Sequence, residues 1–313
     1  MIAGNPKRRF IPPQVHIWGT VTGSDGSTVM VSGLARLAGL GDMIAIEADV
    51  GLLQGEVIAM DEKTLKVLLL SAPEGLRTGQ KAWLQAHENT RPSTAWLGHV
   101  VDAFGRASDG ALPKVNDPEP VGIQGVSPDQ RRPLGRRLST GVAALDTFLP
   151  LCRGQRLGVF AGSGVGKSRL MSDLALGVST DVVIIGLIGE RTREVGEFVR
   201  LLRDSRGLER TVIIAATSDQ SALVKRRAAE LTMETAEFFR DQGRQVLCLF
   251  DSVTRFAEAH REIALASGEN GNLRGFPPST TQQITSLCER AGPGVGQTGD
   301  ITAVFSVLVA GSD

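Results

Sequence analysis

Hydrophobic and polar positions alternate along residues 14–88 in a pattern that predicts short β-strands. Glycine and polar turns such as Ser24-Asp25-Gly26 separate the strand-like runs. The apolar members of these runs are Val15/Ile17, Val29/Val31, Ile44/Ile46 and Leu65/Val67/Leu69. Several short strands at this spacing are typical of a small barrel or sandwich, and we expect a barrel, because closure leaves no free edge strand.

The pattern changes near Gln155, where apolar runs of strand length begin to alternate with helical spacing. The apolar runs cover residues 157–161, 182–188, 212–216, 246–250 and 301–309. Helical spacing lies between them, for example at Val195, Phe198, Val199 and Leu202. Wholly apolar strands that alternate with helices predict an α/β fold, with a parallel sheet covered by helices on both faces.

Residues 104–140 separate these two patterns and are rich in Gly, Pro, Asp and Arg, which predicts a long surface connection. Its arginine pairs at 131–132 and 136–137 suit either a nucleic-acid patch or a solvated or subunit-facing loop, and we favour the loop. The expected divisions are a short N-terminal segment (1–13), a β-barrel domain (14–90) and an α/β core (91–313).

Composition narrows the functional class. The chain has 313 residues with 34 basic and 34 acidic side chains, and zero net charge argues against a protein that coats nucleic acid. Cys152, Cys248 and Cys288 are far apart and form no CxxC, which favours a reducing compartment over a disulfide scaffold or a zinc site. The N-terminal residues have no apolar signal core, and no run reaches about 18 apolar residues, so we expect a soluble cytoplasmic protein.

A glycine-rich turn stands between the first apolar run of the core and the helical segment after it. It reads AGSGVGKS, which fits a P-loop with Ala161 in place of the usual first glycine. Its glycines let successive N–H groups point at phosphate oxygens, and the helix that follows adds its positive end. Lys167 is then placed for the β- and γ-phosphates and Ser168 for Mg²⁺. The predicted phosphate-binding residues are Gly162, Ser163, Gly164, Val165, Gly166, Lys167, Ser168 and Arg169.

Two carboxylates follow apolar runs of the same predicted sheet. Asp251 stands at the carboxyl end of its run, where parallel sheets bind ligands, and beside a P-loop we expect it to hold Mg²⁺ through water, although such an Asp also suits a helix cap. Glu190 is placed to orient an attacking water, and Arg191 to contact the γ-phosphate as charge develops. On position alone, the better interpretation of Glu190 and Glu194 is that they are ordinary acids in the first turn of a helix.

Together these motifs resemble the flagellar and type III protein export ATPases, relatives of the catalytic subunit of rotary ATP synthases. The segments that carry the resemblance are VFAGSGVGKS, GLIGERTREVGEF, AATSDQSALVKRRAA, DQGRQVLCLFDSVTRFAEAHREIALASGE, RGFPPS and ITAVFSVLVAG. The resemblance implies a RecA-like P-loop NTPase core that binds ATP and Mg²⁺. It implies the role of catalytic glutamate for Glu190, the γ-phosphate contact for Arg191, the P-loop roles for Lys167 and Ser168, and the Walker B position for Asp251.

The resemblance also implies a biological setting. Members of the family are cytoplasmic homo-hexamers, peripheral at the inner-membrane export apparatus, that hydrolyse ATP, release chaperones from export substrates and feed the substrates into the channel. The implied partners are export-apparatus membrane proteins, a regulatory stator-like protein and chaperone–substrate complexes, without nucleic acid. Because the family continues beyond the position of Asp313, we expect a fragment or a truncated gene product that lacks the C-terminal helical domain, the arginine finger and the adenine contact.

Four other functions stay open. HREIALASGENGNLRGFPPS favours flagellar over injectisome export. Rotary ATP synthase subunits differ where this chain has SDQSALVKRRAA. A Rho-like RNA translocase needs exposed aromatics on its barrel, and this barrel region holds only Trp18 and Trp83, with no tyrosine in the chain. A nucleotide-binding scaffold without turnover is the fourth alternative.

Overall fold

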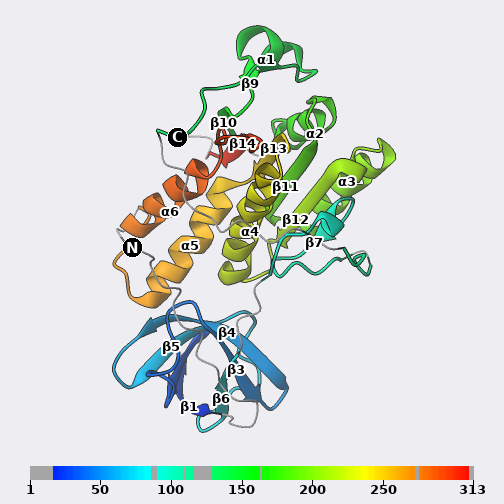
Figure 1. Cartoon of the computed structure of the whole chain (residues 1–313). Helices are drawn as coiled ribbons and strands as arrows, with labels where there is room; N and C mark the ends of the chain where they lie inside the picture. Colours follow the sequence, from blue (N-terminus) through cyan, green and yellow to red (C-terminus); the bar gives the residue numbers. More distant parts are fainter. Residues whose placement is uncertain are drawn as a thin grey trace. The chain divides into compact units, whose positions relative to one another are not determined.

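The computed structural model describes residues 17–85, 90–108, 110–115, 117, 129–162, 164–271 and 275–309. The chain divides into two compact units, residues 1–88 and 89–313, and Figure 1 shows the elements of each. Among the described residues, no helix has both the length and the apolar character that a membrane crossing requires.

The first unit is a closed barrel of six antiparallel strands in the order β1-β2-β5-β4-β3-β6. Its strands are β1 (Trp18–Asp25), β2 (Thr28–Ser32), β3 (Met43–Ala48), β4 (Gly51–Met60), β5 (Thr64–Leu69) and β6 (Lys81–Leu84). Val29, Val31, Ile44 and Ile46 are fully buried, as their alternation predicts. The expected barrel is confirmed, and the carbonyl of Ser32 would lie 2.3 Å from a Cβ at Gly19, which explains the glycine there.

The second unit is built on a six-stranded parallel sheet in the order β10-β14-β13-β11-β12-β7. Its strands are β7 (Val100–Val101), β10 (Arg156–Ala161), β11 (Val182–Glu190), β12 (Thr211–Thr217), β13 (Val246–Asp251) and β14 (Ile301–Leu308). The parallel α/β core is confirmed. The pattern missed β7 at the sheet edge and the two-stranded ribbon of β8 (Arg137–Leu138) and β9 (Leu151–Cys152), because two residues show no periodicity.

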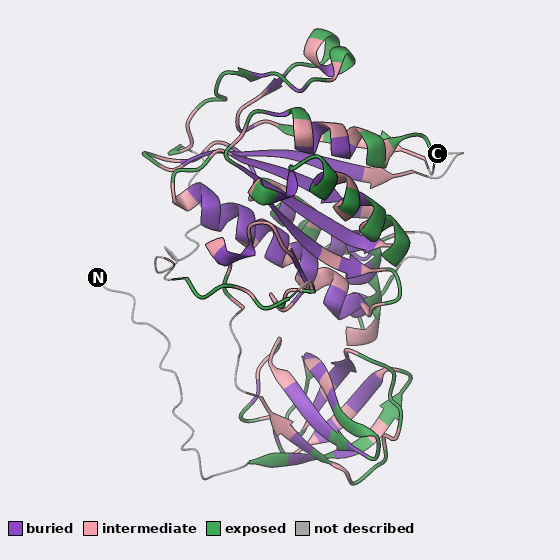
Figure 2. Ribbon diagram, turned by 90° about the vertical axis from the view of Figure 1, so that its right-hand side faces the viewer, coloured by how far each residue is buried: buried purple, intermediate pink, exposed green. Residues whose placement is uncertain are grey.

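Helices cover both faces of this sheet, so that its strands lie buried between two layers (Figures 1 and 2). One layer holds α2 (Lys167–Gly177) and α3 (Thr192–Asp204); the other holds α4 (Ala222–Asp241) and α5 (Val253–Ser267), with α6 (Pro278–Glu289) against α5. The short elements are α1 (Ala143–Phe148), η1 (Thr94–Trp96) and η2 (Leu208–Arg210). Every residue of β13 is buried, as a strand covered on both faces requires.

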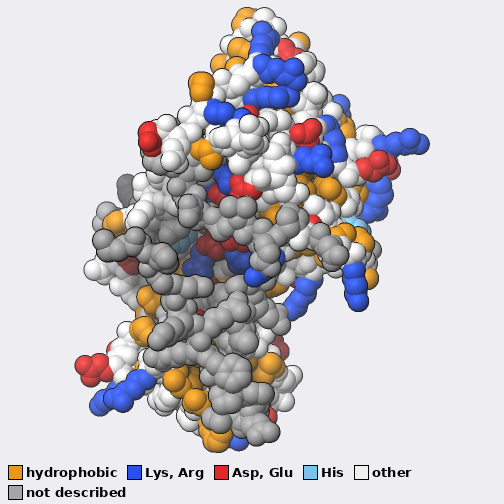
Figure 3. Space-filling model, in the orientation of Figure 1, with side chains coloured by type: hydrophobic (Ala, Val, Ile, Leu, Met, Phe, Trp, Pro, Cys, Tyr) orange, Lys and Arg blue, Asp and Glu red, His pale blue; other side chains and the backbone are white. Residues whose placement is uncertain are grey.

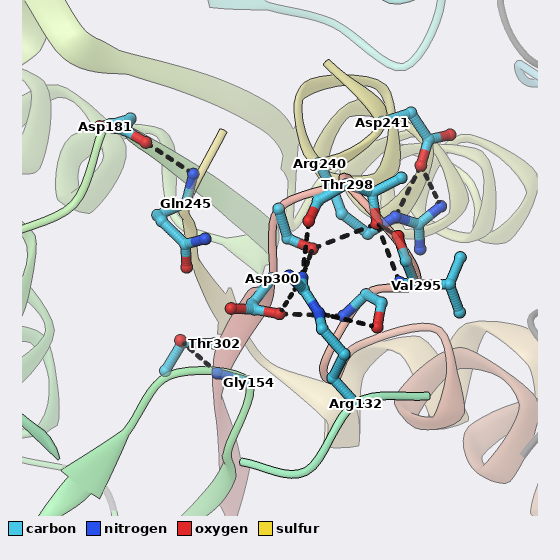
Figure 4. A network of polar contacts seen from close by, with 12 residues as sticks. Arg132, Gly154, Asp181, Arg240, Asp241, Gln245, Val295, Thr298, Asp300 and Thr302 are labelled. Atoms are coloured by element: carbon cyan, nitrogen blue, oxygen red, sulfur yellow. Dashed lines mark hydrogen bonds and ion pairs between the residues drawn. The ribbon is translucent and has the colours of Figure 1, made fainter. Parts of the chain in front are cut away.

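Arg132 fastens the end of the long connection to the loop before β14 (Figure 4). Its guanidinium pairs with Asp300 at 2.8 Å and donates to the carbonyl of Thr298 at 2.6 Å. Asp300 is buried and also accepts the N–H of Gly294 at 3.0 Å. The polar groups that this buried loop would otherwise leave unpaired are therefore satisfied by the connection.

Arg131 acts in the same way and donates to the carbonyls of residues 289 and 291. The expectation of a solvated loop is therefore wrong for Arg131 and Arg132, which are half-buried and bind their own core. It holds for Arg136 and Arg137, which are exposed. Figure 3 shows Lys and Arg side chains gathered over the segment that contains β9 and α1.

Arg210 holds the carboxyl end of α2. Its guanidinium donates to the carbonyls of Ala175 (2.9 Å), Leu176 (3.2 Å), Val178 (3.2 Å) and Thr180 (3.0 Å). The last carbonyls of a helix have no partner within it, and a cation there also meets the negative end of the helix dipole. The helix that begins at the glycine-rich turn is thus fixed at its far end.

Candidate phosphate-binding site

The glycine-rich turn lies between β10 and α2, as the sequence predicts. Gly164 has φ 77° and Gly166 has φ 94°, a left-handed conformation that glycine adopts without steric cost. A Cβ at either residue would meet no atom within 4 Å, so backbone conformation rather than crowding requires the glycines. Gly166 is the N-cap of α2, which begins at Lys167. The predicted phosphate contact Ser163 lies outside the described residues.

Lys167 lies between two carboxylates that come from different strands. Its Nζ is 2.5 Å from Oδ1 of Asp251, at the end of β13, and 3.6 Å from Oε1 of Glu190, at the end of β11. The lysine side chain is only 11% exposed, so water screens these contacts weakly. The structure therefore brings together three site residues that lie far apart in the sequence.

The remaining residues of the predicted loop lie at the surface. Val165 is 68% exposed, and Ser168 and Arg169 are exposed on the first turn of α2. Arg169 pairs with Asp173 one turn further along, at 3.0 Å. Ser168 is thus open to a ligand that approaches the start of the helix.

Asp251 is held by a neighbour that sequence reasoning missed. The hydroxyl of Ser306, on β14, donates to Oδ1 of Asp251 at 2.7 Å. The available signal was a hydroxyl within the apolar run 301–309, on a strand that lies beside the one ending in Asp251. The helix-cap alternative for Asp251 does not apply, because Ser252 is the N-cap of α5 and accepts the N–H of Arg255.

A bulge at the end of β11 sets the position of Glu190. The pairing of β11 with β12 shifts between Ile188 and Glu190, and Gly189 has φ 74° within the shift. A Cβ at Gly189 would lie 3.0 Å from the side chain of Arg255, a tight contact from which that side chain would have to shift. The carbonyl of Glu190 accepts the N–H of Ser218 at 2.9 Å. These contacts fix the backbone that carries the carboxylate.

The electrostatic surroundings of Glu190 change its acidity. Burial, together with the nearby charge of Asp251, raises the pKa of Glu190 to about 7, against the opposing effect of Lys167. A carboxyl with this pKa exchanges a proton near neutral pH, which is the range that suits an acid–base role.

Arg191 is not part of the Lys167 cluster in this structure. Its side chain is 82% exposed, and its guanidinium lies 3.8 Å from the carboxylate of Glu194 on the first turn of α3. Its contact with a γ-phosphate therefore stays a prediction.

The chemistry of these groups fits a hydrated magnesium nucleotide. A helix N-terminus, a loop open to solvent and a lysine suit a phosphate chain. The described residues contain no cluster of three or more His, Cys, Asp or Glu side chains that could hold a metal. The predicted Mg²⁺ groups, Ser168 and Asp251, suit an ion that takes most of its ligands from phosphate and water.

Comparison with known proteins identifies the family. Residues 141–313 match the family described as ATP synthase alpha/beta family, nucleotide-binding domain. The chain is 44% identical to a flagellum-specific ATP synthase of Caulobacter vibrioides over 307 residues, which cover 95% of this chain and 69% of the relative. A type 3 secretion system ATPase of Xanthomonas euvesicatoria is 41% identical and covers 87% of this chain and 59% of its own length.

Solved structures show the same likeness. The assembled ATPase EscN of the enteropathogenic E. coli type III secretion system superposes with a TM-score of 0.82 at 37% identity, over 94% of this chain and 71% of EscN. EscN in complex with its central stalk EscO gives a TM-score of 0.83. The chain spans 59–69% of the two relatives named above. It belongs to the ATP synthase alpha/beta family, in the group that contains flagellum-specific ATP synthases and type III secretion ATPases.

Proposed function

We propose that this chain is the nucleotide-binding part of an ATPase that hydrolyses Mg·ATP to energise flagellar protein export. The observation that carries the proposal is the meeting of Lys167, Glu190 and Asp251 beside a glycine-rich turn, at the carboxyl edge of a parallel sheet. The match to a nucleotide-binding domain family supports nucleotide as the ligand, and the names of the relatives support a role in export.

Each group then has a task that its position supports. Lys167 exchanges its carboxylate partners for the phosphates, which gain a charge-assisted contact. Glu190, freed from the lysine, accepts a hydrogen bond from water and orients it toward the γ-phosphate. Ser168 and Asp251 would hold Mg²⁺, which neutralises charge on the phosphate oxygens when bound. Arg191 would turn from Glu194 to the γ-phosphate.

The proposed assembly is a homo-hexamer with nucleotide at the subunit interfaces. EscN has been solved in an assembled state and with a central stalk, which supports an oligomer and a stalk-like partner here. Phe148 and Phe160 are 80% and 71% exposed in the single chain, as expected of apolar residues that a second subunit covers. The proposed location is the inner-membrane export apparatus, with its membrane proteins, a stator-like regulator and chaperone–substrate complexes as partners.

Injectisome export is a second candidate, because the Xanthomonas relative and EscN both serve type III secretion systems. Deletion of the gene separates the two functions. Loss of motility with normal effector secretion supports the flagellar function, and the reverse phenotype supports the injectisome.

Nucleotide binding tests the phosphate site. Lys167→Ala should weaken Mg·ATP binding about tenfold to a hundredfold, since a hydrogen bond to a charged group contributes about 1.5–3 kcal/mol. Calorimetric titration measures it, with Lys63→Ala in the barrel as a control that should bind like the parent. Equal affinity of parent and Lys167→Ala would remove the phosphate-site assignment.

Turnover of a full-length version of the protein tests the role of Glu190. Glu190→Gln should lower the hydrolysis rate by about 10²–10⁴ and leave ATP affinity nearly unchanged, because a residue that orients water acts mainly in the transition state. Glu194→Gln on the first turn of α3 is the matched control and should retain most of the rate. Hydrolysis by Glu190→Gln at the parent rate would show that another group positions the water.

A further inference from the structure

Ser306 and Asp251 lie side by side on two neighbouring strands. Phe250 of β13 is in register with Phe305 of β14, so the next residues along, Asp251 and Ser306, lie side by side. Ser306 is fully buried, Asp251 is 4% exposed, and the hydroxyl-to-carboxylate distance is 2.7 Å. A hydrogen bond to a carboxylate in such surroundings is short and strong.

The oxygen that Ser306 contacts is also the oxygen that Lys167 contacts. Both donors reach Oδ1 of Asp251, Ser306 at 2.7 Å and Lys167 at 2.5 Å. Within the described residues, Oδ2 of Asp251 receives no hydrogen bond. The carboxylate is therefore held through one oxygen, and the second is left available.

The two donors differ in what they can do. Lys167 has a flexible side chain at the start of α2, and the proposed function requires it to leave Asp251 for the phosphates. Ser306 has a short, fully buried side chain on the strand beside β13, and nothing in the proposed function draws it away from Asp251. After the exchange, Ser306 alone of these two donors still contacts Asp251.

We propose that Ser306 is a positioning residue for the magnesium site: it keeps Asp251 oriented, through Oδ1, while Lys167 moves to the phosphates. This inference rests on the proposed function, which assigns the exchange of Lys167. It gives a reason for a hydroxyl at a fully buried place in an otherwise apolar part of β14, where an unpaired hydroxyl would be costly. Thr302 carries the other buried hydroxyl of β14. Its hydroxyl oxygen accepts the backbone N–H of Gly154 at 3.0 Å and has no contact with Asp251.

The first test compares ADP affinity in excess MgCl₂ and in excess EDTA, because ADP binds without turnover. In Ser306→Ala, the gain in affinity that Mg²⁺ gives the parent should shrink about tenfold, while affinity in EDTA stays close to that of the parent. Ser306→Thr keeps the hydroxyl and should restore most of the gain. Thr302→Val removes a buried hydroxyl from the same strand and should leave the gain intact.

The outcomes separate this inference from the proposed function. If the parent does not bind ADP, the proposed function fails, and the inference fails with it. If the parent binds and Ser306→Ala shows an unchanged gain from Mg²⁺, the inference fails and the proposed function stands. The inference would also fail if Thr302→Val lost as much of the Mg²⁺-dependent gain in ADP affinity as Ser306→Ala does. Removal of any buried hydroxyl from the strand would then have the same effect.

A second test needs no nucleotide. Asp251→Ala, Ser306→Ala and the double variant form a double-mutant cycle on the unfolding equilibrium of the nucleotide-free protein. A direct bond between the two side chains should give a coupling of about tenfold in that equilibrium. Additive effects of the two substitutions would show that Ser306 does not hold Asp251.

Discussion

Glu190 lies between a lysine that stabilises its charge and an aspartate that opposes it. The structure shows which effect is larger, because the pKa of Glu190 rises to about 7 in spite of Lys167 at 3.6 Å. Burial is the main cause, since a carboxylate removed from water loses solvation that one lysine, shared with Asp251, does not replace. At neutral pH the nucleotide-free site therefore holds a mixture of protonated and ionised Glu190.

This shift predicts how stability depends on pH. The folded state binds the Glu190 proton more tightly than the unfolded state, whose ordinary pKa is 4.5, so the contribution is complete below about 4.5 and is lost as pH rises through about 7. Relative to Glu190→Gln, the parent should lose about 3–4 kcal/mol of unfolding free energy across that range. Urea unfolding of both proteins at several pH values measures it. A difference that stays constant with pH would contradict the raised pKa.

Most of the proposed site could be predicted from the sequence, because its residues lie at positions that the local sequence pattern marks. The glycine-rich turn marks Lys167, and the ends of apolar runs mark Glu190 and Asp251. Ser306 could not be found in this way, because its role depends on which strand lies beside β13, and strand order leaves no trace in local sequence. The outward direction of Arg191 depends on a contact with Glu194 that competes with the predicted one.

At the scale of elements, a buried ion pair joins the end of α6 to α4. Arg290 follows α6 and donates from Nε to Glu237 of α4 at 3.1 Å, with a second contact at 2.5 Å. The side chain of Glu237 is 6% exposed and that of Arg290 is 22% exposed. Removal of one member leaves the other charge without its partner in a place where water cannot compensate.

Arg290→Met should therefore lower the free energy of unfolding by about 3–5 kcal/mol. The matched control is Arg193→Met, which breaks the pair of Arg193 with Glu197 on α3, where the two side chains are 87% and 50% exposed. That change should have a much smaller effect, because water surrounds the exposed pair. Chemical denaturation of the three proteins gives both values. Equal effects of the two substitutions would show that burial does not determine the contribution of these pairs.

The elements themselves divide into those that the pattern predicts and those that it does not. Long strands and helices carry enough periodicity to be recognised, as in β13 and α3. The two-residue strands β7, β8 and β9 exist because a partner strand lies beside them. The attachment of Arg131 and Arg132 to the loop before β14 was also hidden, since arginine pairs in a polar connection look the same whether or not they are bound.

At the scale of the molecule, each of the two units has a hydrophobic core of its own. One core fills the barrel, and the core of the second unit lies against its parallel sheet, with one cluster between the sheet and the layer of α2 and α3. The proposed nucleotide site lies wholly within the second unit. Because each unit has its own core and only the second unit holds the proposed site, a bound ligand should stabilise the second unit and leave the stability of the barrel unchanged.

Thermal unfolding should accordingly show two transitions, of which Mg·ADP shifts one. A ligand at a hundred times its Kd adds about 2.7 kcal/mol to the state that binds it, which raises the midpoint of the second unit by roughly 5–10 °C. Calorimetry follows both units, and the midpoint of the barrel should not move. A single transition that moves as a whole on addition of Mg·ADP would show that the units unfold together.

The attachment of Arg210 to α2 has a mechanical consequence. Arg210 ends η2 and directly precedes β12, so its four hydrogen bonds make α2 a strut braced against that strand. The far end of β12 pairs with Glu190 through Thr217. Helix α2 therefore connects the phosphate loop to Arg210, and β12 connects Arg210 to the strand pairing at Glu190. Because these bonds hold the last turn of α2, the helix does not fray at that end and keeps its position relative to β12, the strand that pairs with Glu190.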